Sequence, residues 1–132
     1  MMIGLDTNLL VRYLTHDDPT QTAAALKVMN SLSFDSPGFL SLIVVAELVW
    51  VLVISYRYPK KEIEQVLENL LRTRELVIER ADIVSQASRA FRAGRADFVD
   101  YLIERCAHAA GCEFTMTFDQ KAATVPGMRL PH

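Results

Sequence analysis

Short apolar runs alternate along this chain with longer segments in which apolar residues recur every three or four positions. The runs predict short strands, because a few consecutive apolar residues bounded by turn residues are typical of buried strands. The strands are expected at residues 3–5, 39–40, 75–79 and 114–117, with a weaker one at 128–130. The segments at helical spacing predict helices that start near residue 9 and that cover residues 23–32, 41–56, 59–71, 81–93 and 97–110.

Strands and helices therefore alternate, and no internal repeat or low-complexity segment interrupts them. This order predicts an α/β fold, an α/β/α sandwich with a small, mostly parallel central sheet. A length of 132 residues fits a single domain over residues 1–132.

Local signals place the ends of several elements. Asp18 or Thr20 is expected to cap the second helix and Ser41 the third, while Gly94 and Gly111 end the last two.

Composition narrows the class of protein. Hydrophobic residues make up 51% of the chain, which is too much for a disordered protein. The 16 acidic and 14 basic residues leave a net charge of −2, which excludes a protein that binds nucleic acid through a strongly basic surface alone.

Targeting signals are not apparent. The apolar run Leu42–Ile54 is interrupted by Glu47 and is shorter than the roughly 20 residues that a membrane span needs. The first residues lack the basic region and cleavage site of a signal peptide, and Cys106 and Cys112 fit no zinc or redox spacing. We expect a cytoplasmic protein that is not embedded in a membrane.

Acidic residues follow two of the predicted strands. Asp6 comes after the first strand and Asp119 after the fourth. Sites in parallel sheets form beyond the carboxyl ends of the strands, so both are candidates for a shared site. Each also has a simpler interpretation as the cap of the helix that follows it.

Glu47 is surrounded by apolar residues on both sides. A carboxylate buried in such a segment is costly unless it is paired or coordinated. It is therefore either half of a buried ion pair with an arginine or a metal ligand held on a packed helix.

Asp97, Asp100 and Glu104 share one stripe of the last predicted helix. The opposite face carries apolar residues, which are Phe98, Val99, Leu102, Ile103 and Cys106. The stripe suits a helix that lines an acidic cleft, although Asp97 and Asp100 also suit a capping arrangement at the start of the helix.

One cluster of carboxylates explains all these positions together, provided that a cation neutralises it. Mg²⁺ and Mn²⁺ are hard cations that prefer oxygen ligands, and they support phosphodiester hydrolysis. The sequence shows no G-x-S-x-G elbow, P-loop or dinucleotide fingerprint that would indicate another chemistry.

The ordered set of motifs resembles the PIN-domain family, and within it the VapC-type toxins of toxin–antitoxin pairs. The motifs are Asp6-Thr7-Asn8-Leu9-Leu10, Glu47-Leu48, Asp97-Phe98-Val99-Asp100-Tyr101-Leu102-Ile103 and Thr117-Phe118-Asp119. The resemblance covers nearly the whole chain, and it implies a metal-dependent endoribonuclease that cleaves RNA.

The resemblance also implies roles for individual residues. Asp6, Glu47, Asp100 and Asp119 match the catalytic and metal-binding acids of the family, Asp97 matches an additional acid, and Asn8 and Thr117 match supporting polar positions. Either Asp97 or Asp100 is the third direct ligand. Tyr101 departs from the family, where a small residue is common, and is expected either to narrow the cleft or to contact substrate.

Partners follow from the same resemblance: a homodimer and a cognate antitoxin protein. The apolar helices near residues 23–32 and 60–72 are candidate surfaces for them. Arg12, Arg95 and Arg105 are candidate phosphate contacts, with solvated helix residues as the simpler interpretation.

Two alternatives stay open. A catalytically weak binding module would use the same fold and act through protein partners, with Met29, Leu32, Trp50, Val66 and Leu70 as interface residues. A phosphatase with an aspartate nucleophile is disfavoured, because Asn8 stands where a second aspartate is needed.

Overall fold

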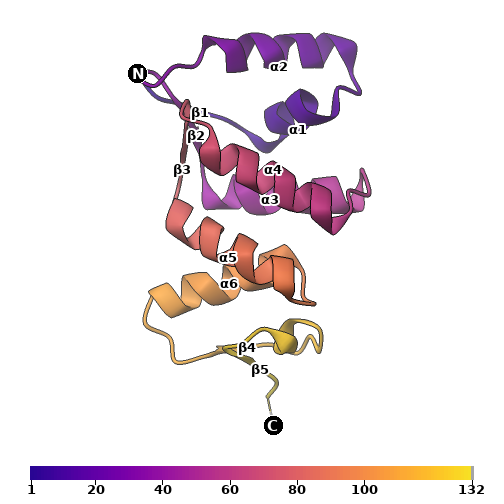
Figure 1. Ribbon diagram of the computed structural model, residues 1–132, viewed down its shortest axis with the longest axis vertical. Coiled ribbons are helices and arrows are strands. Elements are labelled where there is room, and N and C mark those ends of the chain that lie inside the picture. The colour runs from indigo at the N-terminus through magenta and orange to yellow at the C-terminus, as the bar shows by residue number, and fades with distance from the viewer. Residues whose placement is uncertain (132) are drawn as a thin grey trace. The chain divides into compact units, whose positions relative to one another are not determined.

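The computed structural model describes residues 1–131. Its α-helices are α1 (Thr7–Thr15), α2 (Pro19–Ser31), α3 (Leu42–Ile54), α4 (Lys60–Arg72), α5 (Ala81–Ala93) and α6 (Phe98–Ala109). Its strands are β1 (Ile3–Gly4), β2 (Gly38–Leu40), β3 (Leu76–Ile78), β4 (Thr115–Met116) and β5 (Met128–Arg129), and a short 3-10 helix, η1, covers Ala122–Thr124. Figure 1 shows these elements along the chain. Contacts divide the chain into two compact units, Met1–Ala81 (unit 1) and the part from Asp82 onward (unit 2).

Unit 1 is built on a parallel sheet of three strands in the order β1-β2-β3. Ile3 pairs with Gly38, and Gly38 in turn pairs with Leu76. Two helices separate each strand from the next, as a parallel connection requires. Consequently all three strands point the same way, and the residues that follow them lie at one edge of the sheet.

The core of unit 1 comes from the helical faces that the hydrophobic spacing predicts. Helix α1 contacts α2 and α3, and α4 contacts α3 and β3. The most deeply buried side chains belong to α1, β2, α3 and α4, and they are Leu10, Leu40, Val45, Leu48, Leu52, Ile63 and Leu67. Each side chain of this size stabilises the fold by roughly 1.5–3 kcal/mol when it is fully buried.

Unit 2 combines α5 and α6 with the parallel pair β4-β5. Phe91 packs edge-on against both Phe98 and Tyr101, with ring centroids 6.0 and 6.5 Å apart. Gly94 lies so close to the Tyr101 hydroxyl that a Cβ atom there would overlap with it. Gly94 is therefore needed for packing, and its backbone is not among those with positive φ.

The predicted α/β class with small parallel sheets is confirmed, and the single central sheet is replaced by two separate ladders of three and two strands among the described residues. The predicted caps at Asp18 and Ser41 are confirmed, because their side chains accept the backbone N–H groups of Gln21 and Val44 at 3.0 and 3.2 Å. Gly111 ends α6 with φ of 96°.

Some burial predictions are wrong. The first strand was expected to be buried, yet Ile3 is 42% exposed and only Leu5 reaches the core. On α5 the periodicity of apolar residues would place Ala90 on the buried face, yet Ala90 is exposed and the polar Ser88 is buried. On α6, Ile103 is half exposed while Glu104 is buried, which reverses the faces expected for them.

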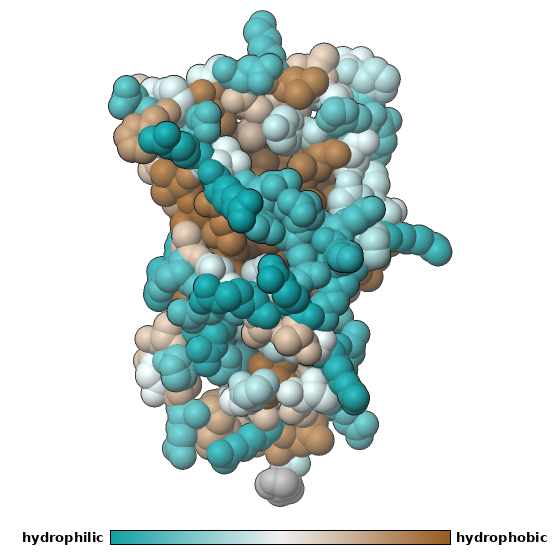
Figure 2. Space-filling model, viewed as in Figure 1, coloured by the Kyte–Doolittle hydropathy of each residue, from teal (hydrophilic) through white to brown (hydrophobic). Residues whose placement is uncertain are grey.

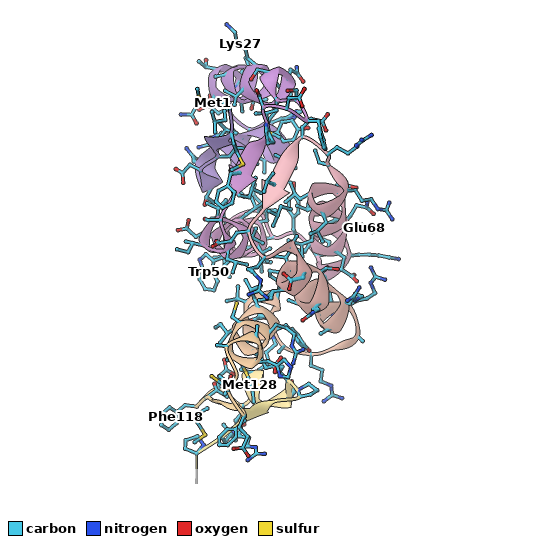
Figure 3. The ribbon with its side chains drawn as sticks, turned by 90° about the vertical axis from the view of Figure 1, so that its left-hand side faces the viewer. Met1, Lys27, Trp50, Glu68, Phe118 and Met128 are labelled. Atoms are coloured by element: carbon cyan, nitrogen blue, oxygen red, sulfur yellow. The ribbon has the colours of Figure 1, made fainter. Side chains whose placement is uncertain are left out.

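Helix α3 is apolar except for Glu47, yet one of its faces is exposed. That face carries Ile43, Glu47, Trp50 and Ile54, and Trp50 is 61% exposed. Trp50 projects from the helix into solvent in Figure 3. Exposed hydrophobic side chains lie among hydrophilic ones on the face that Figure 2 presents. No helix within residues 1–131 is long and apolar enough to cross a membrane.

Candidate active site

Asp6 follows β1 at the edge of the unit 1 sheet and occupies the N-cap position of α1. Aspartate at this position normally accepts a hydrogen bond from the first turn. Here the side chain makes no capping hydrogen bond among the described residues, and it is exposed. Capping alone therefore does not account for this carboxylate.

Glu47 lies in α3, which contacts α1. Its Oε1 accepts a hydrogen bond of 2.8 Å from the Oγ1 of Thr7, which is the residue after Asp6. The predicted burial of Glu47 is wrong, because its apolar sequence neighbours pack inward on other faces of α3 and leave the carboxylate exposed. Buried Thr7 fixes this carboxylate at the start of α1, near Asp6.

Asp97 and Asp100 lie at the start of α6 in unit 2. Asp97 is the N-cap, and Asp100 Oδ2 accepts its backbone N–H at 3.1 Å, which is the return bond of a capping box. The capping interpretation is thus correct for Asp100, but one of its two oxygens is enough for that bond. Asp97 Oδ1 accepts a hydrogen bond of 2.9 Å from the Nζ of Lys121.

Asp119 follows β4 and organises the loop before η1. Its Oδ1 accepts the backbone N–H groups of Lys121 and Ala122 at 2.8 and 3.2 Å. The backbone N–H of Asp119 donates to Thr117 Oγ1 at 3.0 Å. Asp119 therefore caps the turn that leads into η1, while the N-cap position of η1 itself is Lys121. Thr117 contacts Asp119, and its supporting role stays a prediction.

The acidic side chains of unit 2 interact electrostatically. Burial raises the pKa of Asp100 above its usual 3.8, and the negative charges of Asp97 and Asp119 raise it further. Lys121 opposes this effect, and its own pKa is raised, first by its hydrogen bond to Asp97 and then by the negative charges of Asp97, Asp100 and Asp119. Three predicted site residues thus share one electrostatic environment with a lysine.

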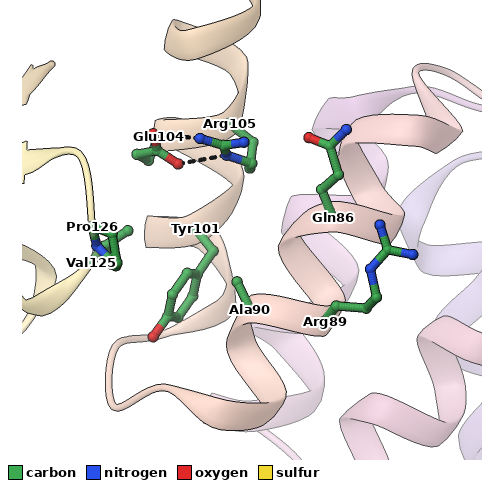
Figure 4. A pocket seen from close by; sticks show the side chains of 8 residues that line it. All are labelled: Gln86, Arg89, Ala90, Tyr101, Glu104, Arg105, Val125 and Pro126. Carbon is green, nitrogen blue, oxygen red and sulfur yellow. Dashed lines mark hydrogen bonds and ion pairs between the residues drawn. The ribbon is translucent and has the colours of Figure 1, made fainter. Parts of the chain in front are cut away.

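Glu104, the third member of the predicted acidic stripe, does not belong to that environment. Its side chain is buried, and its two oxygens accept hydrogen bonds from Nε and Nη2 of Arg105 at 2.7 and 2.9 Å. Figure 4 shows this pair beside a pocket between α5 and α6. Tyr101 is also buried, so it belongs to the core of unit 2 and offers little surface to a substrate. The alternative expectation, that it narrows the cleft, stays a prediction.

The three arginines predicted to contact phosphate differ in their ion-pair partners. Arg12 is tied to Asp17 by an ion pair of 2.8 Å, and Arg105 is tied to Glu104. Arg95 is exposed before α6. Their role toward RNA remains a prediction.

Sequence reasoning missed two residues that contact predicted acids. A threonine does not by itself indicate a functional site. However, Thr7 stands beside Asp6 and on the same helix turn as Asn8, and that position could have indicated its contact with an acid. Lys121 lies two residues after Asp119, and only the return of that loop toward α6 reveals its bond to Asp97.

The donor chemistry fits a hard divalent cation, because carboxylates, hydroxyls and amides are the oxygen donors that Mg²⁺ and Mn²⁺ prefer. Burial is the first cause of the raised pKa of Asp100, and the negative charges of Asp97 and Asp119, which a cation would offset, raise it further. Within residues 1–131, no group of three or more histidine, cysteine, aspartate or glutamate side chains is arranged to hold a metal ion. Asp6 and Glu47 belong to unit 1, and Asp97, Asp100 and Asp119 belong to unit 2.

The fold is that of a small α/β protein with parallel strands. The family model described as "PIN domain" matches residues 3–128, and the chain belongs to this family. The match covers both units. A search of curated proteins found no match to the chain. PIN domains are generally nucleases and typically use divalent metals, so membership of the family supports nuclease activity here and suggests RNA binding.

Proposed function

We propose that this protein is a divalent-metal-dependent endoribonuclease, and that Asp6, Glu47, Asp100 and Asp119 are its catalytic and metal-binding residues. The observation that supports this most directly is that the Asp6 side chain makes no capping hydrogen bond among the described residues. A carboxylate that stands at a strand end and a helix start without capping the helix is free to bind a ligand.

Mg²⁺ or Mn²⁺, when bound, lowers the pKa of water and neutralises phosphate charge. Thr7 holds one oxygen of Glu47, so the carboxylate is oriented before a ligand arrives. Asp100 and Asp119 each use oxygens for backbone N–H groups, which fixes their direction in the same way. Asn8 and Thr117 are supporting residues, and Asp97 is held by Lys121. Arg95 is available to bind a phosphate of the RNA.

The cleavage proposal is tested with structured and single-stranded RNA in Mg²⁺, in Mn²⁺ and in EDTA. We expect cleavage with either metal and none with EDTA. Asp6→Asn should lower the rate at least about 100-fold, since removing a charged group that acts in the transition state typically has effects of this size. Asp35→Asn is a matched control, because Asp35 is an exposed aspartate in a loop of the same unit. Cleavage by Asp6→Asn at the rate of Asp35→Asn would overturn the assignment.

We further propose that the nuclease is the toxin of a toxin–antitoxin pair and acts as a homodimer in the cytoplasm. The similarity of the ordered motifs to VapC-type toxins supports this proposal. Induced expression of the wild type should arrest bacterial growth, whereas Asp6→Asn should not. Co-expression of the protein encoded beside it should relieve the arrest. Light scattering on the purified protein tests for the dimer.

A further inference from the structure

A hollow of about 320 Å³ lies between α1 and α2, at the edge of unit 1 that Asp6 occupies. Its apolar lining comes from both helices and consists of Leu9, Ala24, Ala25 and Val28. Asn8, Arg12 and Gln21 add polar groups, and Asp6 borders the same hollow. The proposed catalytic carboxylate and this surface are therefore neighbours within one unit.

A chain of hydrogen bonds fixes one polar group of the hollow. Tyr56 Oη donates to Asp17 Oδ2 at 2.5 Å, and Asp17 Oδ1 accepts from Arg12 Nη1 at 2.8 Å. Arg12 Nε then donates to Gln21 Oε1 at 2.6 Å. Because the oxygen of the Gln21 amide is engaged in this way, its Nε2 is left with N–H groups to offer.

The charges around the hollow disfavour an anion. Asp17 is paired with Arg12, so the guanidinium carries no uncompensated charge toward a phosphate. The hydrogen bond from Tyr56 lowers the pKa of Asp17, and the hydrogen bond to Asp17 raises the pKa of Arg12. Both groups therefore remain ionised around neutral pH, and the nearby Asp6 carboxylate repels anions as well.

The ligand that fits is uncharged, has apolar faces and carries hydrogen-bonding atoms on its edge. Aliphatic side chains of both helices offer surface to the faces, while Gln21 offers a donor to the edge. Asn8 makes no side-chain hydrogen bond among the described residues, so it offers both a donor and an acceptor. A nucleobase has this combination of properties, and unstacked bases of single-stranded RNA are usually read on their edges.

We propose that the hollow between α1 and α2 is a nucleobase subsite, in which Gln21 selects the base next to the scissile phosphate and Tyr56, Asp17 and Arg12 position Gln21. This inference rests on the proposed ribonuclease function. Since Gln21 presents N–H groups, it favours bases with a carbonyl oxygen on the edge that is read. Uracil and guanine present O4 and O6, whereas cytosine and adenine present amino groups.

The test uses the full-length protein and a pool of RNAs with random sequence, whose cleaved ends are sequenced. The wild type should prefer uracil or guanine at one position beside the cut. Gln21→Glu keeps the acceptor for Arg12 but replaces the donor with an acceptor, so the preference should shift toward cytosine or adenine by about tenfold, the effect of one hydrogen bond. Gln21→Met should remove the preference.

A second pair of variants tests the hollow itself. Ala24 and Ala23 are exposed neighbours on α2, but only Ala24 lines the hollow. Ala24→Leu should fill it and remove base selection, whereas Ala23→Leu should behave like the wild type. Unchanged base preference in both Gln21→Glu and Ala24→Leu would overturn the inference. It would also be overturned if Ala24→Leu kept the preference but lost inhibition by the antitoxin, because the hollow would then be a protein-docking site.

Binding of nucleosides, which carry no phosphate charge, separates this inference from the proposed function. In metal-free protein, uridine should shift the NMR signals of the Gln21 side-chain amide, with weaker shifts from cytidine and with the shifts lost in Ala24→Leu. If the wild type cleaved no RNA but showed these shifts, the ribonuclease proposal would fail and the subsite would stand. If it cleaved RNA and showed none, the subsite would fail.

Discussion

The two units of this chain hold their acidic residues in different ways. In unit 1 the partner of Glu47 is a neutral hydroxyl, that of Thr7, and the carboxylate of Asp6 makes no capping bond among the described residues. In unit 2 Asp97, Asp100 and Asp119 share the positive charge of Lys121. A cation at the acids of unit 2 would compete with an ammonium group, whereas within residues 1–131 no lysine or arginine forms an ion pair with Asp6 or Glu47. The carboxylates are thus held by a hydroxyl contact in unit 1 and by charge compensation in unit 2.

The largest expected effect comes from removing one acid of each unit. Asp6→Asn and Asp119→Asn should each lower the RNA cleavage rate at least about 100-fold. If both act in one reaction, the double variant should be hardly slower than either single variant, because residues that act as a unit are not additive. Single-turnover kinetics measures this. Rate losses that multiply would show that the two units contribute independently.

Replacement of two glycines by alanine should have different effects on stability, because the two glycines differ in how closely other atoms pack against them. Gly94→Ala places a Cβ atom against the Tyr101 side chain in unit 2, and overpacking of this kind costs about 1–3 kcal/mol. At Gly4 in unit 1 an added Cβ meets nothing within 4 Å, so Gly4→Ala should change stability by less than about 0.5 kcal/mol. Urea denaturation measures both. Addition of Tyr101→Phe should restore part of the stability of Gly94→Ala, and no recovery would contradict the contact.

The charge compensation of unit 2 predicts opposite pKa changes in two variants. Asp119→Asn removes a negative charge and should lower the pKa of Asp100, whereas Lys121→Met removes a positive charge and should raise it. Carboxyl carbon NMR on metal-free protein measures both shifts. Because the pKa of Asp100 is raised on folding, its contribution to stability is present below about pH 3.8 and is lost as the pH rises through the raised value. Shifts of the same sign in the two variants would refute the shared environment.

The smallest expected effects come from the two supporting hydroxyls. Thr7→Val removes the donor to Glu47, and Thr117→Val removes the acceptor for the Asp119 N–H. Each change should slow cleavage by up to about tenfold, since one hydrogen bond contributes about 0.5–1.5 kcal/mol. Thr7→Ser and Thr117→Ser are the matched controls and should retain most activity. A loss as large as that of Asp6→Asn would mean that the hydroxyl has a direct role.

The periodicity of apolar residues predicted where the helices lie, but it did not predict which face of every helix is buried. Helix α5 has the predicted bounds, and Ser41 caps α3 as expected, because spacing and capping are local properties. Glu104 shows the limit: the i, i+4 spacing from Asp100 suggested a shared face, yet Glu104 is buried and forms an ion pair with its neighbour Arg105. Whether a charged residue of a helix is buried depends on how that helix packs in the unit, which the spacing of acids along the helix does not show.

For the candidate site, the sequence indicated which acids follow strands and open helices. It could not indicate how each carboxylate is bound. Glu47 was interpreted as buried because its neighbours are apolar, but those neighbours pack on other faces of α3, and its polar contact comes from Thr7, 40 residues earlier in the chain. The contact of Lys121 with Asp97 likewise joins residues 24 apart in the sequence.

The helix start at Asp6 has a consequence for engineering. Helix α1 begins without a side-chain bond to its first turn, and such a bond commonly stabilises a protein by about 1 kcal/mol. Stabilising changes are easy to find at sites of this kind, and they often lower activity. If Asp6 is catalytic as proposed, a selection for heat resistance alone would favour replacements of Asp6 that cap α1, and the more stable variants would have lost activity.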